Sequence, residues 1–372
     1  MGFAGRAWDQ WLAIRNRLLA SDRFQKFALD FPPFRPVSRA RSRQLFDLLA
    51  GFTYSQVLYA TVKLGLIDIL AGQPLSAAAV AARCGWAPER MERLLKAAAA
   101  LQILERTSDG SFTLGIHGAA LAGNPWIAKF IAHHHILYDD LADPIALLSG
   151  EKKQNKLKDF WGYSGSDAAD AVDPANAAPY TALMAASQAA VAAEILASYD
   201  FSRHRHLIDV GGSNGTFLAA AAAKHPGLKL SLFDLPAVAE LARPKLASLG
   251  NGVEIHGGSF LTDELPKGPD VATLIRIAHD HDDESVLTML AAIRRMLPPG
   301  GVLILAEPLS GLPATAPVAD AYFGLYFAAM GQGRTRSPQE IENLSRQAGF
   351  SKLSVVKTRN PVVTGMLRLD VS

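Results

Sequence analysis

The spacing of hydrophobic residues along the chain changes near residue 200. Before that point, apolar residues recur at helical spacing in runs such as 46–70, 75–85 and 87–104, so the pattern predicts helices. After about Asp200, short apolar runs alternate with helical stretches, which is typical of a parallel sheet covered by helices on both faces. The sequence therefore predicts an α/β fold preceded by an all-helical region.

Several apolar runs of the second half are predicted as strands. The last two are separated by Asn360 and Pro361 instead of by a helix, so we expect an antiparallel hairpin at the sheet edge. The predicted strands are HLIDV (206–210), LKLSLFDL (228–235), VEIHGGSF (253–260), VATLIRIA (271–278), GVLILAEPL (301–309), LSVVKTR (353–359) and TGMLRLD (364–370). The helices between the first five are expected within 215–225, 237–249 and 283–297.

The helical half contains a predicted hairpin at 104–115, with Asp109 and Gly110 at its turn. Helices followed by a two-stranded wing are typical of a winged-helix domain. The helix predicted around Ser76–Arg83 offers almost no cations to DNA phosphates, so we expect a homodimer and no nucleic-acid partner. The expected segments are an arm (1–45), the winged-helix dimerisation domain (46–122), connecting and pocket helices (123–195) with a loop around Glu151–Asp173, and the sheet domain (196–372).

Positive charge is concentrated at the N-terminus. The net charge of the chain is +2, but residues 1–45 contain nine cations and three anions, which leaves −4 for the rest. Trp8 and Trp11 fall at helical spacing beside Arg15. Two interpretations stay open: the arm packs on its own domain or on a partner subunit, or it lies as an amphipathic helix on an anionic membrane surface.

Composition predicts a globular protein of the cytoplasm. Hydrophobic residues make up 49% and charged residues 19%, which excludes a disordered chain. Cys84 is the only cysteine, and the first residues lack the pattern of a signal peptide. Residues 174–193 carry no charge and are long enough to cross a bilayer, but their alanine-rich, partly polar composition favours a helix of a soluble protein.

The turn after the first predicted strand is the strongest candidate site. Ligands of open parallel sheets bind beyond the carboxyl ends of the strands, and the first strand-to-helix turn usually binds them. Gly211, Gly212 and Gly215 let the backbone approach a ligand closely and leave the start of the next helix accessible.

Two acids frame this turn. Asp209 ends the first strand and can face an aminium group, whereas Asp234, 25 residues later, can accept both ribose hydroxyls while Leu235 packs on adenine. A dinucleotide site would need glycine at the positions of Ser213 and Thr216, and an acid on the first strand would repel a pyrophosphate. S-adenosylmethionine, which carries a cationic amino acid moiety, is therefore favoured over NAD, and a purely structural turn is the remaining alternative.

Five motifs lie at the ends of the predicted strands: DVGGSNG (209–215), FDLP (233–236), GGSF (257–260), HDHDDE (279–284) and AE (306–307). Together they resemble the motifs of the small-molecule O-methyltransferase family, which includes the plant caffeic-acid enzymes and acetylserotonin methyltransferase. The winged-helix domain and the antiparallel end of the sheet match this family too, so the resemblance covers most of the chain. Segments 46–58, 137–150, 180–192 and 321–338 are most similar to bacterial 1-hydroxycarotenoid O-methyltransferases.

The resemblance implies an S-adenosylmethionine-dependent O-methyltransferase with a class I methyltransferase sheet, in which His279 is the catalytic base and Glu307 hydrogen-bonds and orients it. The more specific similarity implies that the acceptor is the C1 hydroxyl of an acyclic carotenoid. Two alternatives stay open. One is methylation of another hydrophobic small molecule, such as a phenol, a polyketide or a bacteriochlorophyll precursor, and the other is a non-catalytic cofactor- or DNA-binding regulator with this fold.

The position of His279 is consistent with a base. It directly follows the fourth predicted strand, at the same edge as the glycine turn, and an imidazole with a pKa near neutrality is suited to proton removal. The alternatives are that His279 only caps the helix starting near Asp282, and that Glu307 is a solvated edge residue. We expect no metal site at His133–His135, because consecutive side chains on a helix point in different directions.

Four positions depart from the family pattern. Ser213 replaces the third glycine of the turn, Ser259 replaces an acid that often contacts adenine, and His281 replaces a tryptophan. Gly333 stands where the family has a second acid, which leaves a single carboxylate for the histidine.

The remaining expected contacts are of two kinds. Further cofactor contacts are expected at Met184, Ser259, Phe260 and Arg276. An apolar acceptor pocket is expected from Phe160, Trp161, Tyr180, Tyr322, Phe323 and Phe327.

Overall fold

The computed structural model describes residues 3–152, 154–160, 187–249, 252–312 and 315–372. The chain separates into two units, Met1–Gly123 and Asn124–Ser372. Each unit has buried apolar residues of its own.

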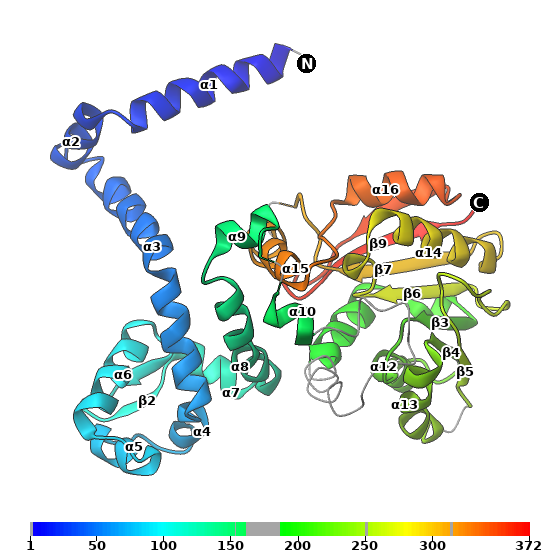
Figure 1. The fold of residues 1–372 in the computed structure, drawn as a ribbon, viewed down its shortest axis with the longest axis horizontal. Helices are drawn as coiled ribbons and strands as arrows, with labels where there is room; N and C mark the ends of the chain where they lie inside the picture. Colours follow the sequence, from blue (N-terminus) through cyan, green and yellow to red (C-terminus); the bar gives the residue numbers. More distant parts are fainter. Residues whose placement is uncertain (1–2, 153, 161–186, 250–251, 313–314) are drawn as a thin grey trace. The chain divides into compact units, whose positions relative to one another are not determined.

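The N-terminal unit is helical apart from one hairpin (Figure 1). Its longest helix, α3, begins at Arg35, continues past residue 45 and stops before Gly65, whose left-handed backbone (φ +67°) starts α4. The predicted hairpin is confirmed, because Leu104 pairs with Leu114 around a turn that contains Gly110. The elements are α1 (Phe3–Leu19), α2 (Asp22–Asp30), α3 (Arg35–Lys63), α4 (Leu66–Ala71), α5 (Ala77–Cys84), α6 (Pro88–Ala100), β1 (Leu104–Arg106), β2 (Phe112–Leu114) and α7 (Ile116–Ala122).

The C-terminal unit is built on a seven-stranded sheet with the order β5-β4-β3-β6-β7-β9-β8. The first five are parallel, whereas β9 runs antiparallel to both β7 and β8. The expected antiparallel hairpin is therefore confirmed, with β9 inserted between β7 and the edge strand β8. The strands are β3 (His206–Val210), β4 (Lys229–Asp234), β5 (Glu254–Gly257), β6 (Val271–Ile275), β7 (Val302–Glu307), β8 (Lys352–Val356) and β9 (Gly365–Asp370).

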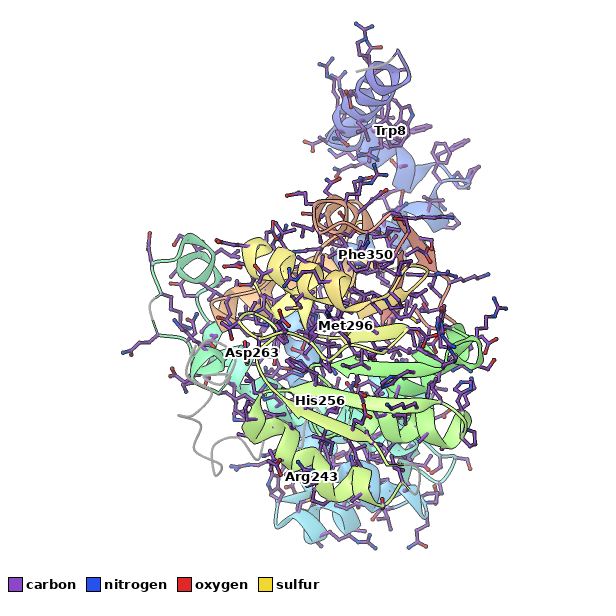
Figure 2. All side chains as sticks on the ribbon, turned by 90° about the vertical axis from the view of Figure 1, so that its right-hand side faces the viewer. Trp8, Arg243, His256, Asp263, Met296 and Phe350 are labelled. Carbon is purple, nitrogen blue, oxygen red and sulfur yellow. The ribbon has the colours of Figure 1, made fainter. Side chains whose placement is uncertain are left out.

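Helices cover both faces of this sheet (Figure 1). Every residue of β3, β6 and β7 is buried, as the pattern of continuous apolar runs predicts for central parallel strands. One face packs against α14 and α16, and the other against α12, α13 and the helix over 187–198. In Figure 2, Met296 and Phe350 lie on one side of the sheet and Arg243, on α13, lies on the other.

Besides the apolar residues on the two faces of the sheet, this unit has a third apolar cluster. In it, α8, α9, α10 and α15 pack against one another. The helical elements are α8 (Pro125–Asp140), α9 (Pro144–Ser149), α10 (Lys156–Phe160), η2 (Phe201–Arg203), α12 (Thr216–Lys224), α13 (Pro236–Ala247), η3 (Ala278–Asp280), α14 (Asp283–Met296), the π-helix η4 (Pro317–Phe323), α15 (Gly324–Met330) and α16 (Pro338–Gln347).

One expectation for this region was wrong, because the loop predicted around Glu151–Asp173 contains the helix α10. The buried carboxylate of Asp140 accepts the backbone N–H groups of Lys156 and Leu157, at 3.0 and 2.8 Å. These bonds satisfy donors at the start of α10, and Leu157 is fully buried. A contact over 16 residues fixes this helix, so local sequence could not indicate it.

Residues 187–198 form a helix, which includes the described end of the alanine-rich helix expected over 174–193. Its residues before 187 lie outside the described residues. No helix in the described part of the chain combines the length and the apolar character that crossing a bilayer requires.

Candidate active site

The predicted site residues of the sheet domain meet along one edge, because parallel neighbouring strands end on the same side. The turn after β3 lies between Asp234, at the end of β4, and the residues that follow β6. Glu307 ends β7, the other neighbour of β6. The residues at this edge are Asp209, Gly211, Gly212, Gly215, Asp234, Leu235, Ser259, Phe260, Arg276, His279 and Glu307.

The glycine turn has a backbone that side chains would obstruct. Gly211 and Gly215 both have φ +72°, and a Cβ added at Gly212 would lie 2.7 Å from Oδ2 of Asp209. Gly215 precedes α12, which begins at Thr216. Ser213 also has a left-handed backbone (φ +51°), so the residue that replaces the family's third glycine carries the strain that glycine would avoid.

Asp209 and Asp234 lie on adjacent strands on either side of this turn. Oδ1 of Asp209 accepts the hydroxyl of Thr273 at 2.6 Å, while its Oδ2 is buried without a partner. Asp234 accepts the backbone N–H groups of Ser213 and Leu235, at 2.7 and 2.8 Å. Burial raises the pKa of Asp209 to about 7 and that of Asp234 to about 6. A buried, unpaired carboxylate oxygen beside a glycine turn fits a ligand that brings a cationic donor.

His279 lies on η3, three residues after the left-handed Arg276 (φ +57°), which follows the last residue of β6. Its ring centroid lies 5.0 Å from that of Phe327 and 6.5 Å from that of Phe323. Nε2 is 3.4 Å from Oδ1 of Asp280, and Nδ1 is buried without a partner. Burial, reinforced by the positive charge of Arg276, lowers the pKa of His279 well below 6.5. The imidazole is therefore neutral at pH 7, as a base must be.

Glu307 hydrogen-bonds the main chain of His279. Its Oε2 accepts the backbone N–H of His279 at 3.0 Å, and Oε1 is buried without a partner. The expected hydrogen bond between Glu307 and His279 is therefore present, but it is made to the main chain of the histidine and not to its imidazole. The carboxylate ends β7 beside β6, so it reaches the first turn of η3 and holds the main chain of the histidine. Burial raises the pKa of Glu307 to about 8.

Unpaired polar atoms are concentrated at this edge of the sheet. Six side-chain nitrogen or oxygen atoms of the described residues are buried without a hydrogen-bond partner, and three of them belong to Asp209, His279 and Glu307. Native proteins pair most buried polar atoms. Such a concentration therefore indicates a site whose partners come from a ligand or from ordered water.

Aromatic side chains line the region next to His279. Phe323 ends the π-helix η4 and Phe327 lies on α15, and short π-helical segments are frequent at functional sites. The hydroxyl of Tyr322, also on η4, forms a hydrogen bond with Nε2 of His134 at 2.8 Å. A cavity of about 630 Å³ is lined by Phe327, Gly333 and residues of α9 and α10. Phe160 packs against the same cluster as Phe323, whereas Trp161, Tyr180 and Met184 lie outside the described residues.

The other expected cofactor contacts follow the strands that flank the turn. Leu235 precedes the first residue of α13. The backbone N–H of Ser259 donates to Asp263 at 2.8 Å, and the ring of Phe260 packs edge-on against His281, with 5.6 Å between centroids. Arg276 donates to the hydroxyl of Ser187 at 2.8 Å, so it links the end of β6 to the helix over 187–198.

Sequence reasoning missed two charged residues at this site. Asp280 is adjacent to His279, and burial raises the pKa of Asp280 to about 7. The sequence shows that Asp280 belongs to the motif, but not that its carboxylate approaches Nε2 of His279. Arg336 is fully buried and donates to the carbonyl oxygen of Ala278. No local pattern connects an arginine to a turn 58 residues away.

Comparisons with known proteins agree with this geometry. Residues 138–351 match the family model of the O-methyltransferase domain, and residues 46–119 match the O-methyltransferase dimerisation domain. The chain is 44% identical to demethylspheroidene O-methyltransferase of Cereibacter sphaeroides, over 93% of this chain and 92% of that protein. It is 38% identical to the protein of the same name from Rhodobacter capsulatus, over 95% of this chain and 88% of that protein.

Solved structures show the same fold. Human N-acetylserotonin methyltransferase in complex with SAM has a TM-score of 0.72 and 23% identity, over 89% of this chain and 98% of that one. CalO1, a methyltransferase of calicheamicin biosynthesis in its SAH-bound form, has a TM-score of 0.73 and 26% identity, over 90% and 98% of the two chains. The expected class I methyltransferase sheet is therefore confirmed.

Fold and site together define a methyltransferase of the class I type. The chain belongs to the O-methyltransferase family, whose members take the methyl group from S-adenosylmethionine. The matched dimerisation domain supports the expected homodimer. Within that domain, the apolar residues Leu48, Leu49 and Phe52 of α3 are exposed in the single chain, as residues at an interface between subunits would be.

Proposed function

We propose that this enzyme methylates the C1 hydroxyl of acyclic 1-hydroxycarotenoids. The observation that carries the proposal is the 44% and 38% identity, over nearly the whole chain, to two proteins named demethylspheroidene O-methyltransferase. The aromatic surroundings of His279 support a hydrophobic acceptor.

S-adenosylmethionine supplies a methyl group on a positively charged sulfur when it is bound. The residues of this chain fit such a ligand. Asp209 offers an unpaired carboxylate oxygen to the aminium group, and Asp234 can exchange its backbone partners for ribose hydroxyls. The glycine turn lets the main chain approach the ligand. Leu235, Ser259, Phe260, Arg276 and Met184 complete the proposed cofactor contacts.

His279 is the proposed base. A neutral imidazole can accept the hydroxyl proton of the acceptor, and the low pKa of His279 keeps it neutral through the physiological range. An aliphatic alcohol is about as weak an acid as water, with a pKa near 16. Proton removal must therefore accompany attack by the oxygen, so the alignment of the oxygen should matter more than the strength of the base.

The proposed pocket residues determine this alignment. Phe323 and Phe327 leave the imidazole little freedom, since both rings contact it, and Glu307 fixes its main chain. Flat aromatic surfaces suit the extended chain of conjugated double bonds of a carotenoid. Phe160, Trp161, Tyr180 and Tyr322 are proposed to extend this surface.

The test is an acceptor panel with labelled S-adenosylmethionine. Purified protein is incubated with 1-hydroxycarotenoids, a phenol, a polyketide and a bacteriochlorophyll precursor, and products are analysed by mass spectrometry. We expect addition of a methyl group to the 1-hydroxycarotenoid. Transfer to another acceptor class alone would replace the carotenoid assignment, and the absence of cofactor binding by calorimetry would support a regulator without catalytic activity.

We further propose that the N-terminal helix α1 contacts the membrane in which such an acceptor dissolves. Trp8, Trp11 and Ile14 are 59%, 49% and 69% exposed. The two tryptophan rings stack at 5.1 Å, and the guanidinium of Arg15 lies 5.1 Å from the ring of Trp11. An exposed aromatic face beside excess positive charge suits the interface of an anionic bilayer.

A further inference from the structure

Arg336 is a charged side chain with no exposed surface. Its guanidinium donates to the carbonyl oxygens of Ala278 and His281, at 2.8 and 2.7 Å. Nε donates to the carboxylate of Asp283 at 2.8 Å. These three acceptors lie on both sides of His279, so one rigid group spans the whole segment that carries the imidazole.

The main chain around Arg336 is fixed at the same place. The backbone N–H of Arg334 donates to the carbonyl oxygen of His279 at 2.8 Å. The backbone N–H of Ser310 donates to the carbonyl oxygen of Arg336 at 3.0 Å, next to a parallel bridge between Leu309 and Arg336. Residues 334–336 therefore connect the segment of His279 to the chain that follows β7.

Gly333 shows how closely this segment approaches the turn that carries His279. It has φ +79°, and an added Cβ would lie 2.3 Å from the carbonyl oxygen of His279 and 2.9 Å from Cα of Asp280. Backbone contacts at this distance exclude any side chain unless the main chain shifts. The close approach that allows the side chain of Arg336 and the main chain of Arg334 to hold the histidine segment thus requires glycine at position 333.

We propose that Arg336 is a positioning residue, which holds His279 in the orientation for proton removal. The inference rests on the proposed role of His279 as the base. A planar guanidinium makes several hydrogen bonds in fixed directions. The orientation of the imidazole is here set through its main chain, by Arg336 on one side and Glu307 on the other.

The charge of Arg336 also acts on the group that it positions. The charged and titratable groups around the imidazole are Arg276, Asp280, His281, Glu307 and Arg336. The cation of Arg336 lowers the pKa of both His279 and Glu307, although burial is the largest cause of each shift. Removal of this cation should therefore raise the pKa of His279, which a residue that only stabilises the fold would leave unchanged.

The test compares Arg336→Met, Arg336→Lys and Arg334→Met in the full-length protein. Arg334 pairs with the same Asp283 and with Glu340, but its guanidinium has no bond to a carbonyl beside His279, so it controls for loss of the ion pair. For Arg336→Met we expect kcat to fall about tenfold to a hundredfold, the usual cost of a misplaced group, with unchanged affinity for S-adenosylhomocysteine. For Arg334→Met we expect kcat within about twofold of the wild type.

Two further readouts separate positioning from stability. In Arg336→Met the acid limb of the kcat/KM profile, and the pKa of His279 measured by histidine NMR without acceptor, should both move to higher pH. Arg336→Lys keeps the charge but cannot bond both carbonyls, so kcat should be intermediate while the acid limb stays in place.

The proposal is wrong if folded Arg336→Met has the kcat of Arg334→Met, or if cofactor affinity falls as much as kcat does. Should Arg336→Met not fold, Arg336→Lys decides, and a wild-type kcat in that variant overturns the inference. Wild-type protein that methylates another acceptor class contradicts only the proposed carotenoid. The ratios of kcat are then measured on that acceptor, and the NMR pKa needs no acceptor at all.

Discussion

His279 is buried beside Phe327 and Phe323, and its neutral form is favoured because burial penalises the imidazolium. We expect His279→Ala to lower kcat by about 10²–10⁴, the usual contribution of a general base, and to leave the affinity for S-adenosylhomocysteine nearly unchanged. His117→Ala, an exposed histidine on α7, is the matched control. Steady-state kinetics and calorimetry measure the two quantities, and equal losses in both would contradict the assigned role.

Asp209 should make cofactor affinity depend on pH. Burial raises its pKa to about 7, so it becomes protonated as the pH falls below 7, and a neutral carboxyl binds an aminium group less well. The dissociation constant for S-adenosylhomocysteine should therefore rise as the pH falls from 7.5 to 5.5, by up to about tenfold per pH unit. Asp209→Asn should bind weakly with a flatter pH dependence. Calorimetry that finds the same constant throughout this range for the wild type would exclude this role.

At the scale of elements, the segment after α15 has to approach the histidine turn closely. Gly333 and Gly331 both have φ +79°, but only a Cβ at Gly333 would meet the main chain of His279. Alanine at either position should destabilise the fold by about 1–2 kcal/mol because of the left-handed backbone. Only Gly333→Ala should also lower kcat by about tenfold or more. Chemical denaturation and kinetics check both, and similar kcat values for the two variants would refute a close approach at Gly333.

The sequence could predict the strands and the residues that follow them, but not the contacts of the segment after α15. Strands such as β3 and β7 were predictable because their apolar runs are continuous and end at turn residues. The glycine turn and His279 were predictable because each follows such a strand, so the topology alone brings them to one edge. Arg336 was not, because its partners are main-chain oxygens 55 and 58 residues away. Main-chain donors and acceptors leave no residue pattern, which also explains why the sequence did not show that Glu307 bonds the main chain of His279.

At the scale of the whole molecule, we expect the basic arm (1–45) to bind the lipid surface and to have no part in methyl transfer. Deletion of residues 1–34, which stops before α3, should abolish flotation with phosphatidylglycerol vesicles and leave kcat on detergent-dispersed acceptor within about twofold. Raised salt should weaken the flotation of the intact protein, since the charges are exposed. Undiminished flotation would end the membrane proposal. A truncated protein that is monomeric by light scattering would instead indicate that the arm packs on the partner subunit.

The central claim is that Asp209 and Asp234 hold the cofactor at the edge of the sheet to which His279 also belongs. A crystal structure of the full-length protein with S-adenosylhomocysteine and a 1-hydroxycarotenoid tests it most directly. We predict that the aminium group binds at Asp209, the ribose at Asp234, and that an imidazole nitrogen of His279 lies within hydrogen-bond distance of the acceptor hydroxyl. A cofactor bound elsewhere, or an imidazole that faces away from that hydroxyl, would contradict the account.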